Sequence, residues 1–210
     1  MKIQIALDFG TIDACKAILN DVVEYVDIVE VGAISTEYGV RALKEIKEAF
    51  PGPEYLADLK IADGGEYFAE MAYKYGADYV TVLGAVDNAT IQSALDAGNK
   101  LGIKVVADML GVPNFMERVN ELDAMGMHYL SVHTPADLQA LNYTPFEHLR
   151  IASMLVKNSK LSVAGGIGPA NVQEVLPYKP EIIISGSALT MSENRKENAK
   201  KLREIVDNYQ

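Results

Sequence analysis

Short apolar runs alternate with stretches of helical periodicity along the whole chain, and this alternation constrains the fold more than any other feature. The helical stretches include residues 38–50, 66–75, 91–101, 115–125 and 197–209. Each apolar run is short and apolar on both faces, a pattern typical of a parallel strand buried between two layers. Eight such runs occur, at residues 3–7, 28–31, 55–57, 79–83, 105–107, 129–132, 161–164 and 182–184.

Eight strand–helix units in a chain of 210 residues leave about 26 residues for each unit, which suits a lean (β/α)8 barrel. No linker rich in Pro, Gly or Ser and no block of like charge divides the chain. We therefore predict an α/β fold with a single domain over residues 1–210, closed as a (β/α)8 TIM barrel. A doubly wound open sheet is the structural alternative that the same alternation permits.

The charge balance excludes some classes of partner. The chain has 19 Lys and Arg against 29 Asp and Glu, a formal net charge of −10. This balance disfavours binding to nucleic acid or to an anionic membrane, because both need clustered Lys and Arg. A small anionic substrate remains compatible, since backbone N–H groups can bind a phosphate without net positive charge.

The sequence also indicates the cellular location of the protein. No apolar run approaches the ~20 residues of a membrane span, and residues 1–8 resemble a strand rather than a signal peptide. We expect a soluble, cytoplasmic protein. The single cysteine, Cys15, can form neither an internal disulfide nor a Cys-rich metal site, and its helical surroundings predict a buried structural thiol.

Ionisable residues close several of the predicted strands, where the chemistry of such barrels is found. Asp8, Asp108 and His133 follow the first, fifth and sixth runs, and Glu30 lies inside the second. A lone carboxylate inside an apolar run is costly to bury, so Glu30 predicts a metal or cationic partner. The alternatives are that Asp8 caps the helix beginning near Thr11, Asp108 is a turn residue, and His133 is a structural histidine.

The third strand ends in the motif Asp58-x-Lys60-x-x-Asp63. Asp58 and Lys60 point the same way on an extended strand, because side chains alternate with a period of two. The acid keeps the lysine charged and fixes its direction, and a cation so placed can stabilise an enediolate forming on a substrate. Asp63 follows where the strand gives way to a loop or helix. An ordinary surface salt-bridge group is the alternative.

Glycines follow the last two strands and predict an anion site. Gly165-Gly166 comes after the seventh run, and Gly186-Ser187 after the eighth. Glycine lets backbone amides approach an anion closely, and barrels commonly hold a substrate phosphate at this place. Tight turns without a ligand are the alternative.

Together these residues resemble the 3-hexulose-6-phosphate synthase family, within the wider orotidine-5′-phosphate decarboxylase superfamily. The resemblance runs from residue 2 to about residue 206, and the Asp58-x-Lys60-x-x-Asp63 motif at the end of the third strand is its most specific part. Its other parts are Ala6-Leu7-Asp8, Val29-Glu30-Val31-Gly32, residues 76–84, Val132-His133-Thr134, residues 137–140 and residues 163–167.

The resemblance implies a carbon–carbon lyase of carbohydrate metabolism, which joins D-ribulose 5-phosphate to formaldehyde in a reversible, magnesium-dependent aldol reaction. It implies Glu30 and Asp58 as ligands of Mg2+, with Mn2+ as a possible substitute. Lys60 and the metal would stabilise the enediolate, and His133 would act as the acid/base. The implied substrate-binding residues are Asp8 and Asp108 for hydroxyls, and Gly166, Gly186 and Ser187 for the phosphate.

The resemblance further implies a homodimer with shared active sites, in which Asp63 reaches into the site of the partner subunit as a catalytic residue. The sister family, 3-keto-L-gulonate-6-phosphate decarboxylase, remains an alternative because it uses the same enediolate chemistry. Ala136, Ser187 and Asp108 favour the synthase, whereas Ile61-Ala62-Asp63 is closer to the decarboxylase. A sugar-phosphate-binding barrel without catalytic activity is the alternative of another class.

Overall fold

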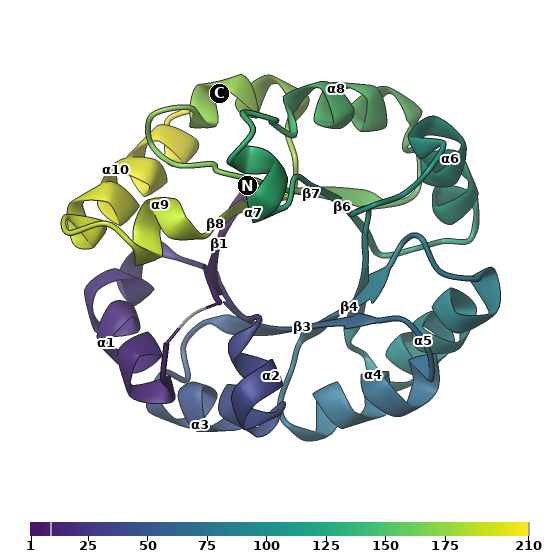
Figure 1. Cartoon of the computed structure of the whole chain (residues 1–210), viewed down its shortest axis with the longest axis horizontal. Helices are drawn as coiled ribbons and strands as arrows, with labels where there is room; N and C mark the ends of the chain where they lie inside the picture. The colour runs from purple at the N-terminus through teal and green to yellow at the C-terminus, as the bar shows by residue number, and fades with distance from the viewer. Residues whose placement is uncertain (9, 210) are drawn as a thin grey trace.

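Eight parallel strands form a closed barrel in the order β1-β2-β3-β4-β5-β6-β7-β8, with β8 paired back to β1. This computed structural model describes residues 1–8 and 10–209. Figure 1 looks along the barrel and shows the helices as an outer ring around the strands. Closure of the sheet confirms the predicted (β/α)8 barrel and rules out the open, doubly wound sheet.

Each predicted run coincides with a strand, but several strands extend by one or more residues into polar positions. The largest difference is at the third strand, which continues through the Asp58–Lys60 motif to Ile61. The strands are β1 (Lys2–Leu7), β2 (Ile28–Val31), β3 (Glu54–Ile61), β4 (Tyr79–Leu83), β5 (Lys104–Asp108), β6 (Tyr129–His133), β7 (Lys160–Ala164) and β8 (Ile182–Ser185).

The helices differ from the predicted stretches in two places. The stretch expected over residues 38–50 forms a helix only over Arg41–Ala49, and an additional short helix, which was not predicted, precedes it at Ile34–Tyr38 and ends at Gly39, whose φ is 72°. The crossover from β7 to β8 contains short 3-10 turns instead of an α-helix, and Pro177 at the start of the second turn is incompatible with a helix interior. The α-helices are α1 (Ile12–Val22), α2 (Ile34–Tyr38), α3 (Arg41–Ala49), α4 (Gly65–Lys74), α5 (Asn88–Leu101), α6 (Phe115–Ala124), α7 (Ala136–Gln139), α8 (Phe146–Leu155), α9 (Ser187–Thr190) and α10 (Arg195–Asp207), and the 3-10 turns are η1 (Val23–Tyr25), η2 (Val172–Glu174) and η3 (Leu176–Tyr178).

Two layers of apolar side chains hold the barrel together. The larger layer fills the space between strands and helices and includes Cys15, which is fully buried as predicted. The smaller layer lies inside the barrel, where the rings of Tyr79 and Tyr129 meet edge to face with centroids 5.7 Å apart. Both tyrosines stand at the first residue of their strands. They therefore fill the amino-terminal end of the interior and leave the carboxyl-terminal end for polar side chains.

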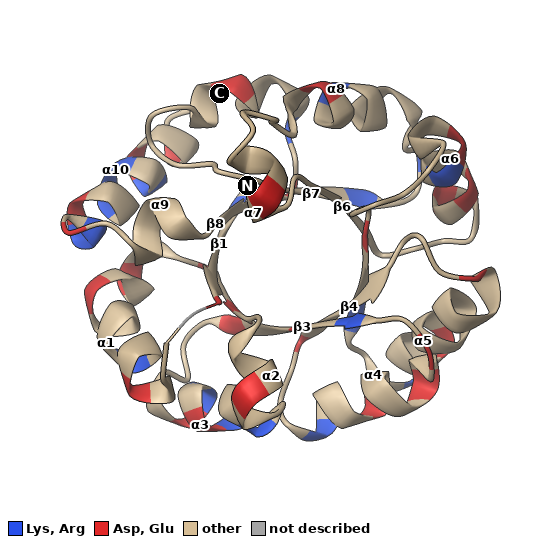
Figure 2. Ribbon diagram, in the orientation of Figure 1, with Lys and Arg blue, Asp and Glu red and all other residues tan. Residues whose placement is uncertain are grey.

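Charged residues of both signs are distributed over the outer helices, as Figure 2 shows for this face of the molecule. Many of them form ion pairs with exposed partners, such as Lys16 with Glu45 and Arg150 with Glu147. Pairs of this kind contribute little to stability in water. Within the described ranges, no helix has the length and apolar character that crossing a membrane requires.

Candidate active site

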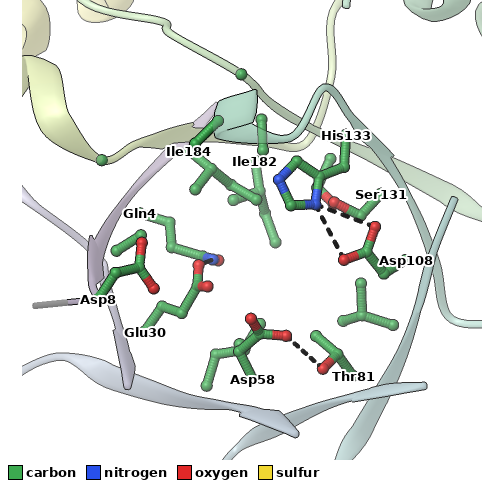
Figure 3. Close-up of a pocket in the computed structure, with 18 of the residues that line it drawn as sticks. Gln4, Asp8, Glu30, Asp58, Thr81, Asp108, Ser131, His133, Ile182 and Ile184 are labelled. Carbon is green, nitrogen blue, oxygen red and sulfur yellow. Dashed lines mark hydrogen bonds and ion pairs between the residues drawn. The ribbon is translucent and has the colours of Figure 1, made fainter. Parts of the chain in front are cut away.

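A cavity opens at the carboxyl-terminal ends of the strands, and it brings together nearly all the residues that the sequence singled out. Figure 3 shows the carboxylates of Asp8, Glu30, Asp58 and Asp108 directed into one space, with His133 at its edge. The predicted residues that line this cavity are Asp8, Glu30, Asp58, Lys60, Asp108, His133, Gly166, Gly186 and Ser187.

Lys60 lies between two of the acids. Its Nζ forms an ion pair with Oδ2 of Asp58 and lies 3.7 Å from Oδ2 of Asp108. Burial alone lowers the pKa of Lys60, but the negative charges of Asp58, Asp108 and Glu30 outweigh this effect and raise it. The lysine is therefore a fixed cation in the mouth of the barrel rather than a surface salt bridge, which was the alternative.

Lys60 also has an unusual backbone. Its φ is +42°, in the left-handed region that side chains other than glycine seldom adopt. The pairing of β3 with β4 shifts register between Ala57 and Ile61, so the strand is irregular where the lysine stands. This irregularity could not be predicted from the period-two pattern of the motif.

Asp8 and Glu30 form the acidic side of the cavity. Burial, together with the charges of Asp58 and Asp8, raises the pKa of Glu30 well above its usual value. The pKa of Asp8 is raised in the same way, chiefly by burial and also by Asp58. The Nε2 amide of Gln4 donates a 2.5 Å hydrogen bond to Glu30. Burial and mutual repulsion therefore disfavour the charged forms of these two acids, and a bound cation would favour them.

The carboxylate of Asp8 faces the end of β2 and does not cap a helix. Oδ1 of Asp8 accepts a hydrogen bond from the Ala33 amide at 3.3 Å, whereas the cap of α1 is Thr11, whose Oγ1 accepts from the Ala14 amide. The capping alternative for Asp8 is therefore wrong. Gly32 leaves the room that this carboxylate occupies, because a Cβ at that position would collide with Oδ1 of Asp8.

His133 and Asp108 form a hydrogen-bonded pair across the ends of β6 and β5. The imidazole Nδ1 lies 3.0 Å from Oδ2 and 3.2 Å from Oδ1 of Asp108, as the dashed lines in Figure 3 show. Burial raises the pKa of Asp108, but the hydrogen bond and charge of His133 and the charge of Lys60 outweigh burial and lower it. The carboxylate orients the ring and leaves Nε2 for a substrate.

The glycine-rich ends of β7 and β8 lie between those of β6 and β1 and form the side of the cavity that faces β3 and β4. Gly165 and Gly166 have φ values of 132° and 67°, and Gly166 lies against Oε1 of Gln139. The side chain of Gln139, from α7, donates to the carbonyl of Thr134 at 2.7 Å and joins the cavity lining. Gly186 immediately precedes α9. Little side-chain volume obstructs the backbone at this side, as an anion site requires.

Asp63 is the one predicted site residue that does not line the cavity of its own chain. Its Oδ1 accepts a 2.7 Å hydrogen bond from the amide of Gly64, just before α4. The side chain is exposed. Its predicted role in a partner's site stays a prediction.

The sequence analysis did not single out several polar residues that line the cavity. Gln4 stands two residues before Ala6 and four before Asp8 on β1, so the strand alternation predicts that it faces inward. Thr81, Ser131 and Ser162 stand within apolar strands, where such residues carry no distinctive pattern. The cavity-lining polar residues that were missed are Gln4, Thr81, Ser131, Gln139 and Ser162.

The residues fit a magnesium ion, provided that other ligands complete its coordination. In residues 1–8 and 10–209, no group of three or more His, Cys, Asp or Glu side chains is arranged to hold a metal. Glu30 and Asp58 supply two carboxylates in a cavity that Asp8 and Asp108 also line. Mg2+ is commonly bound by one or two carboxylates together with water and substrate oxygens. Oxygen donors and local charge therefore suit this ion.

Comparisons with known proteins identify the relatives of the chain. The sequence profile described as "Orotidine 5'-phosphate decarboxylase / HUMPS family" matches residues 1–202. A 3-hexulose-6-phosphate synthase from Bacillus subtilis is 41% identical over 207 residues, which cover 98% of this chain and 99% of that protein.

Solved structures agree with this result. The crystal structure of 3-hexulose-6-phosphate synthase from Salmonella typhimurium matches with a TM-score of 0.98 and 38% identity, over 100% of both chains. A 3-keto-L-gulonate-6-phosphate decarboxylase from Vibrio cholerae matches with a TM-score of 0.86 and 28% identity, over 100% of this chain and 98% of the other. The chain therefore belongs to the orotidine 5′-phosphate decarboxylase / HUMPS family.

Proposed function

We propose that this chain is a carbon–carbon lyase that joins D-ribulose 5-phosphate to formaldehyde to form 3-hexulose 6-phosphate, and that it also catalyses the reverse reaction. The observation that carries the proposal is the position of Lys60, held among Asp58 and Asp108 and across the mouth from the glycine-rich ends of β7 and β8. A sugar phosphate would bind with its phosphate at the glycines and its carbonyl near the lysine. Full-length similarity to synthases of this name supports the choice of reaction.

The reaction begins with loss of a proton from the carbon beside the carbonyl of ribulose 5-phosphate. The electron pair moves to the carbonyl oxygen, and the ammonium of Lys60 stabilises the negative charge that develops there. The enediolate carbon then bonds to the carbon of formaldehyde as the ketone of the sugar re-forms. The π electrons of formaldehyde move to its oxygen, which takes up a proton. His133 exchanges protons in these steps, because Asp108 orients its ring and leaves Nε2 directed to the substrate.

The remaining residues bind and orient the substrate. Asp8 and Asp108 accept hydrogen bonds from its hydroxyls, and backbone amides at Gly166, Gly186 and Ser187 hold its phosphate. Glu30 and Asp58 would hold Mg2+, or Mn2+ in its place. When bound, the ion would supply positive charge next to the substrate oxygens.

We further propose a homodimer in which Asp63 serves the site of the partner subunit. Asp63 lies outside its own cavity, and the adjoining α4 exposes three aromatic side chains. Tyr67 is 66% exposed, Phe68 36% and Tyr73 50%. Such residues are enriched in interfaces between subunits, so this surface suits contact with a second copy.

An assay of formaldehyde consumption tests the proposed reaction. Purified protein is incubated with Mg2+, ribulose 5-phosphate and formaldehyde, and loss of formaldehyde is followed with and without chelator. We expect consumption that requires the sugar phosphate and stops when the chelator is added.

If folded, metal-loaded protein consumes no formaldehyde, the synthase proposal is wrong. Release of carbon dioxide from 3-keto-L-gulonate 6-phosphate would then assign the decarboxylase reaction, for which the Vibrio cholerae relative is named. Binding of both sugar phosphates without turnover would indicate a non-catalytic barrel.

A further inference from the structure

The backbone of Lys60 is left-handed, with a φ of +42°. This conformation is strained, so other interactions must stabilise it. A residue other than glycine in this region is strained and persists only where the surroundings hold it. In β3 the register with β4 changes between the pairs Ala57–Val80 and Ile61–Val82. The amide of Lys60 therefore lies where the regular ladder is interrupted.

Thr81 lies in that interruption, between Val80 and Val82 on β4. Its Oγ1 accepts a 2.9 Å hydrogen bond from the backbone amide of Lys60. The same hydroxyl donates a 2.6 Å hydrogen bond to Oδ1 of Asp58 (Figure 3). Because one hydroxyl has a single donor and two acceptor positions, both bonds can exist together.

These two bonds join the backbone of Lys60 to the carboxylate that pairs with its ammonium group. Oδ2 of Asp58 contacts Nζ of Lys60 while Oδ1 is held by Thr81. Thr81 is only 6% exposed, so water has little access to replace its hydroxyl. The lysine is thus restrained at both ends of its side chain through one threonine.

We propose that Thr81 is a positioning residue for catalysis, and that its hydroxyl holds Lys60 and Asp58 in the geometry that the reaction needs. This inference rests on the proposed function, in which Lys60 stabilises the developing charge. Without the hydroxyl, the Lys60 amide has no acceptor and Asp58 is free to turn. The ammonium group then leaves its position, and a shift of about 1 Å in a catalytic group can cost about 100-fold in rate.

Substitutions at Thr81 distinguish the effect of the hydroxyl from the effect of the volume of the side chain. Thr81→Val keeps the shape and removes the hydroxyl, Thr81→Ser keeps the hydroxyl, and Thr81→Ala is a smaller variant in case valine disturbs folding. We expect Thr81→Val and Thr81→Ala to lower kcat at least about 10-fold, with KM for ribulose 5-phosphate changed less than about twofold. Thr81→Ser should stay within about threefold of the wild-type kcat.

Amide hydrogen exchange provides a readout that does not depend on activity. The Lys60 amide should exchange at least about 10-fold faster in Thr81→Val than in the wild type, and Thr81→Ser should restore its protection. If Thr81→Val is folded and its kcat equals that of the wild type, the positioning role is wrong. It is equally wrong if Thr81→Ser is as impaired as Thr81→Val, or if the Lys60 amide exchanges at the same rate in all variants.

The two readouts also distinguish failure of this inference from failure of the proposed function. If the wild type consumes no formaldehyde, the function is wrong, and amide exchange still decides whether Thr81 holds Lys60. If the wild type is active and Thr81→Val is equally active, the function stands and the inference falls.

Discussion

Lys60 places its ammonium group between Asp58 and Asp108, on the cavity side of a strand whose neighbouring positions are apolar. The surrounding acids keep this group charged despite burial, as its proposed role in catalysis requires. The residue types and spacing of this cluster were predictable from the sequence. Its backbone conformation and its contact with Thr81 were not, because both follow from a change of register between β3 and β4 that the residue pattern of neither strand reveals.

Lys60→Ala should lower kcat by about 100- to 1,000-fold, because it removes a charge that acts mainly on the transition state. The KM for ribulose 5-phosphate should change much less, and circular dichroism should show an intact fold. Lys44→Ala is the matched control, since Lys44 is 60% exposed and pairs only loosely with Glu48, at 3.8 Å. Near-normal turnover of Lys60→Ala would remove the lysine from the proposed mechanism.

A second residue-scale prediction concerns His128, at the amino-terminal end of the barrel. Its Nδ1 accepts a 3.0 Å hydrogen bond from the amide of Val105, and Nε2 lies 3.1 Å from Oδ1 of Asn99. Burial, together with the charge of Lys104, lowers the pKa of His128 below its usual value. As the pH falls, the unfolded chain therefore binds this proton before the folded chain does.

The stabilisation from His128 is accordingly complete above about pH 6.5, the usual histidine pKa, and is lost as the pH falls toward its lower value in the fold. His128→Asn keeps an acceptor for the Val105 amide without the proton. Urea denaturation of both proteins between pH 7.5 and 5.5 checks this: the wild type should lose more unfolding free energy. Parallel curves for wild type and variant would contradict it.

At the scale of the elements, side chains that precede β2, β4 and β6 accept a hydrogen bond from the amide of the second residue of the strand before them, β1, β3 and β5. Asp27, before β2, accepts from the Ile3 amide, and Asp78, before β4, accepts from the Tyr55 amide. His128, before β6, does the same for β5. The same hydrogen bond therefore occurs in three strand pairs. It fixes their amino-terminal ends, whereas residues at their carboxyl-terminal ends line the cavity.

Strand positions were largely predictable, because a buried parallel strand leaves a short, continuous apolar run. The apolar run at residues 55–57 marked only the first half of β3, and the Asp58-x-Lys60 motif was needed to predict that the strand continues beyond Ala57. The division between α2 and α3 depends on the positive φ of Gly39, which the apolar periodicity on either side does not reveal.

Close packing of α4 against α5 gives a prediction at this scale. A Cβ on Gly65 would collide with the carbonyl of Thr90 and would lie 2.6 Å from the Ala94 amide nitrogen, both rigid backbone groups. Gly65→Ala should therefore lower the free energy of unfolding by about 2 kcal/mol, the usual range for overpacking. Chemical denaturation measures this directly.

Gly52→Ala is the control for that substitution, because nothing lies within 4 Å of its added Cβ. It should change stability by less than about 0.5 kcal/mol. Equal stability of the Gly65→Ala and Gly52→Ala proteins would show that α4 can move away from α5 at little cost.

At the scale of the whole molecule, Lys60 and Asp63 lie on different surfaces of one subunit, and the proposed dimer would bring a lysine and an aspartate from different subunits together. Lys60 lies inside the cavity, whereas Asp63 lies outside it, three residues further along the chain and next to the exposed aromatic side chains of α4. If the partner's Asp63 completes each site, then one subunit supplies the lysine and the other supplies the acid. Loss of either residue would inactivate both sites of a homodimer.

Mixing two inactive variants tests this arrangement. Lys60→Ala and Asp63→Ala are unfolded together, refolded and assayed for formaldehyde consumption. Random pairing places half of the chains in mixed dimers, and each mixed dimer has one intact site and one site with both changes. Activity should therefore recover to about one quarter of the wild-type value. Each variant refolded alone is the control, and a mixture that remains as inactive as its components, although mixed dimers are present, would show that Asp63 does not serve the partner's site.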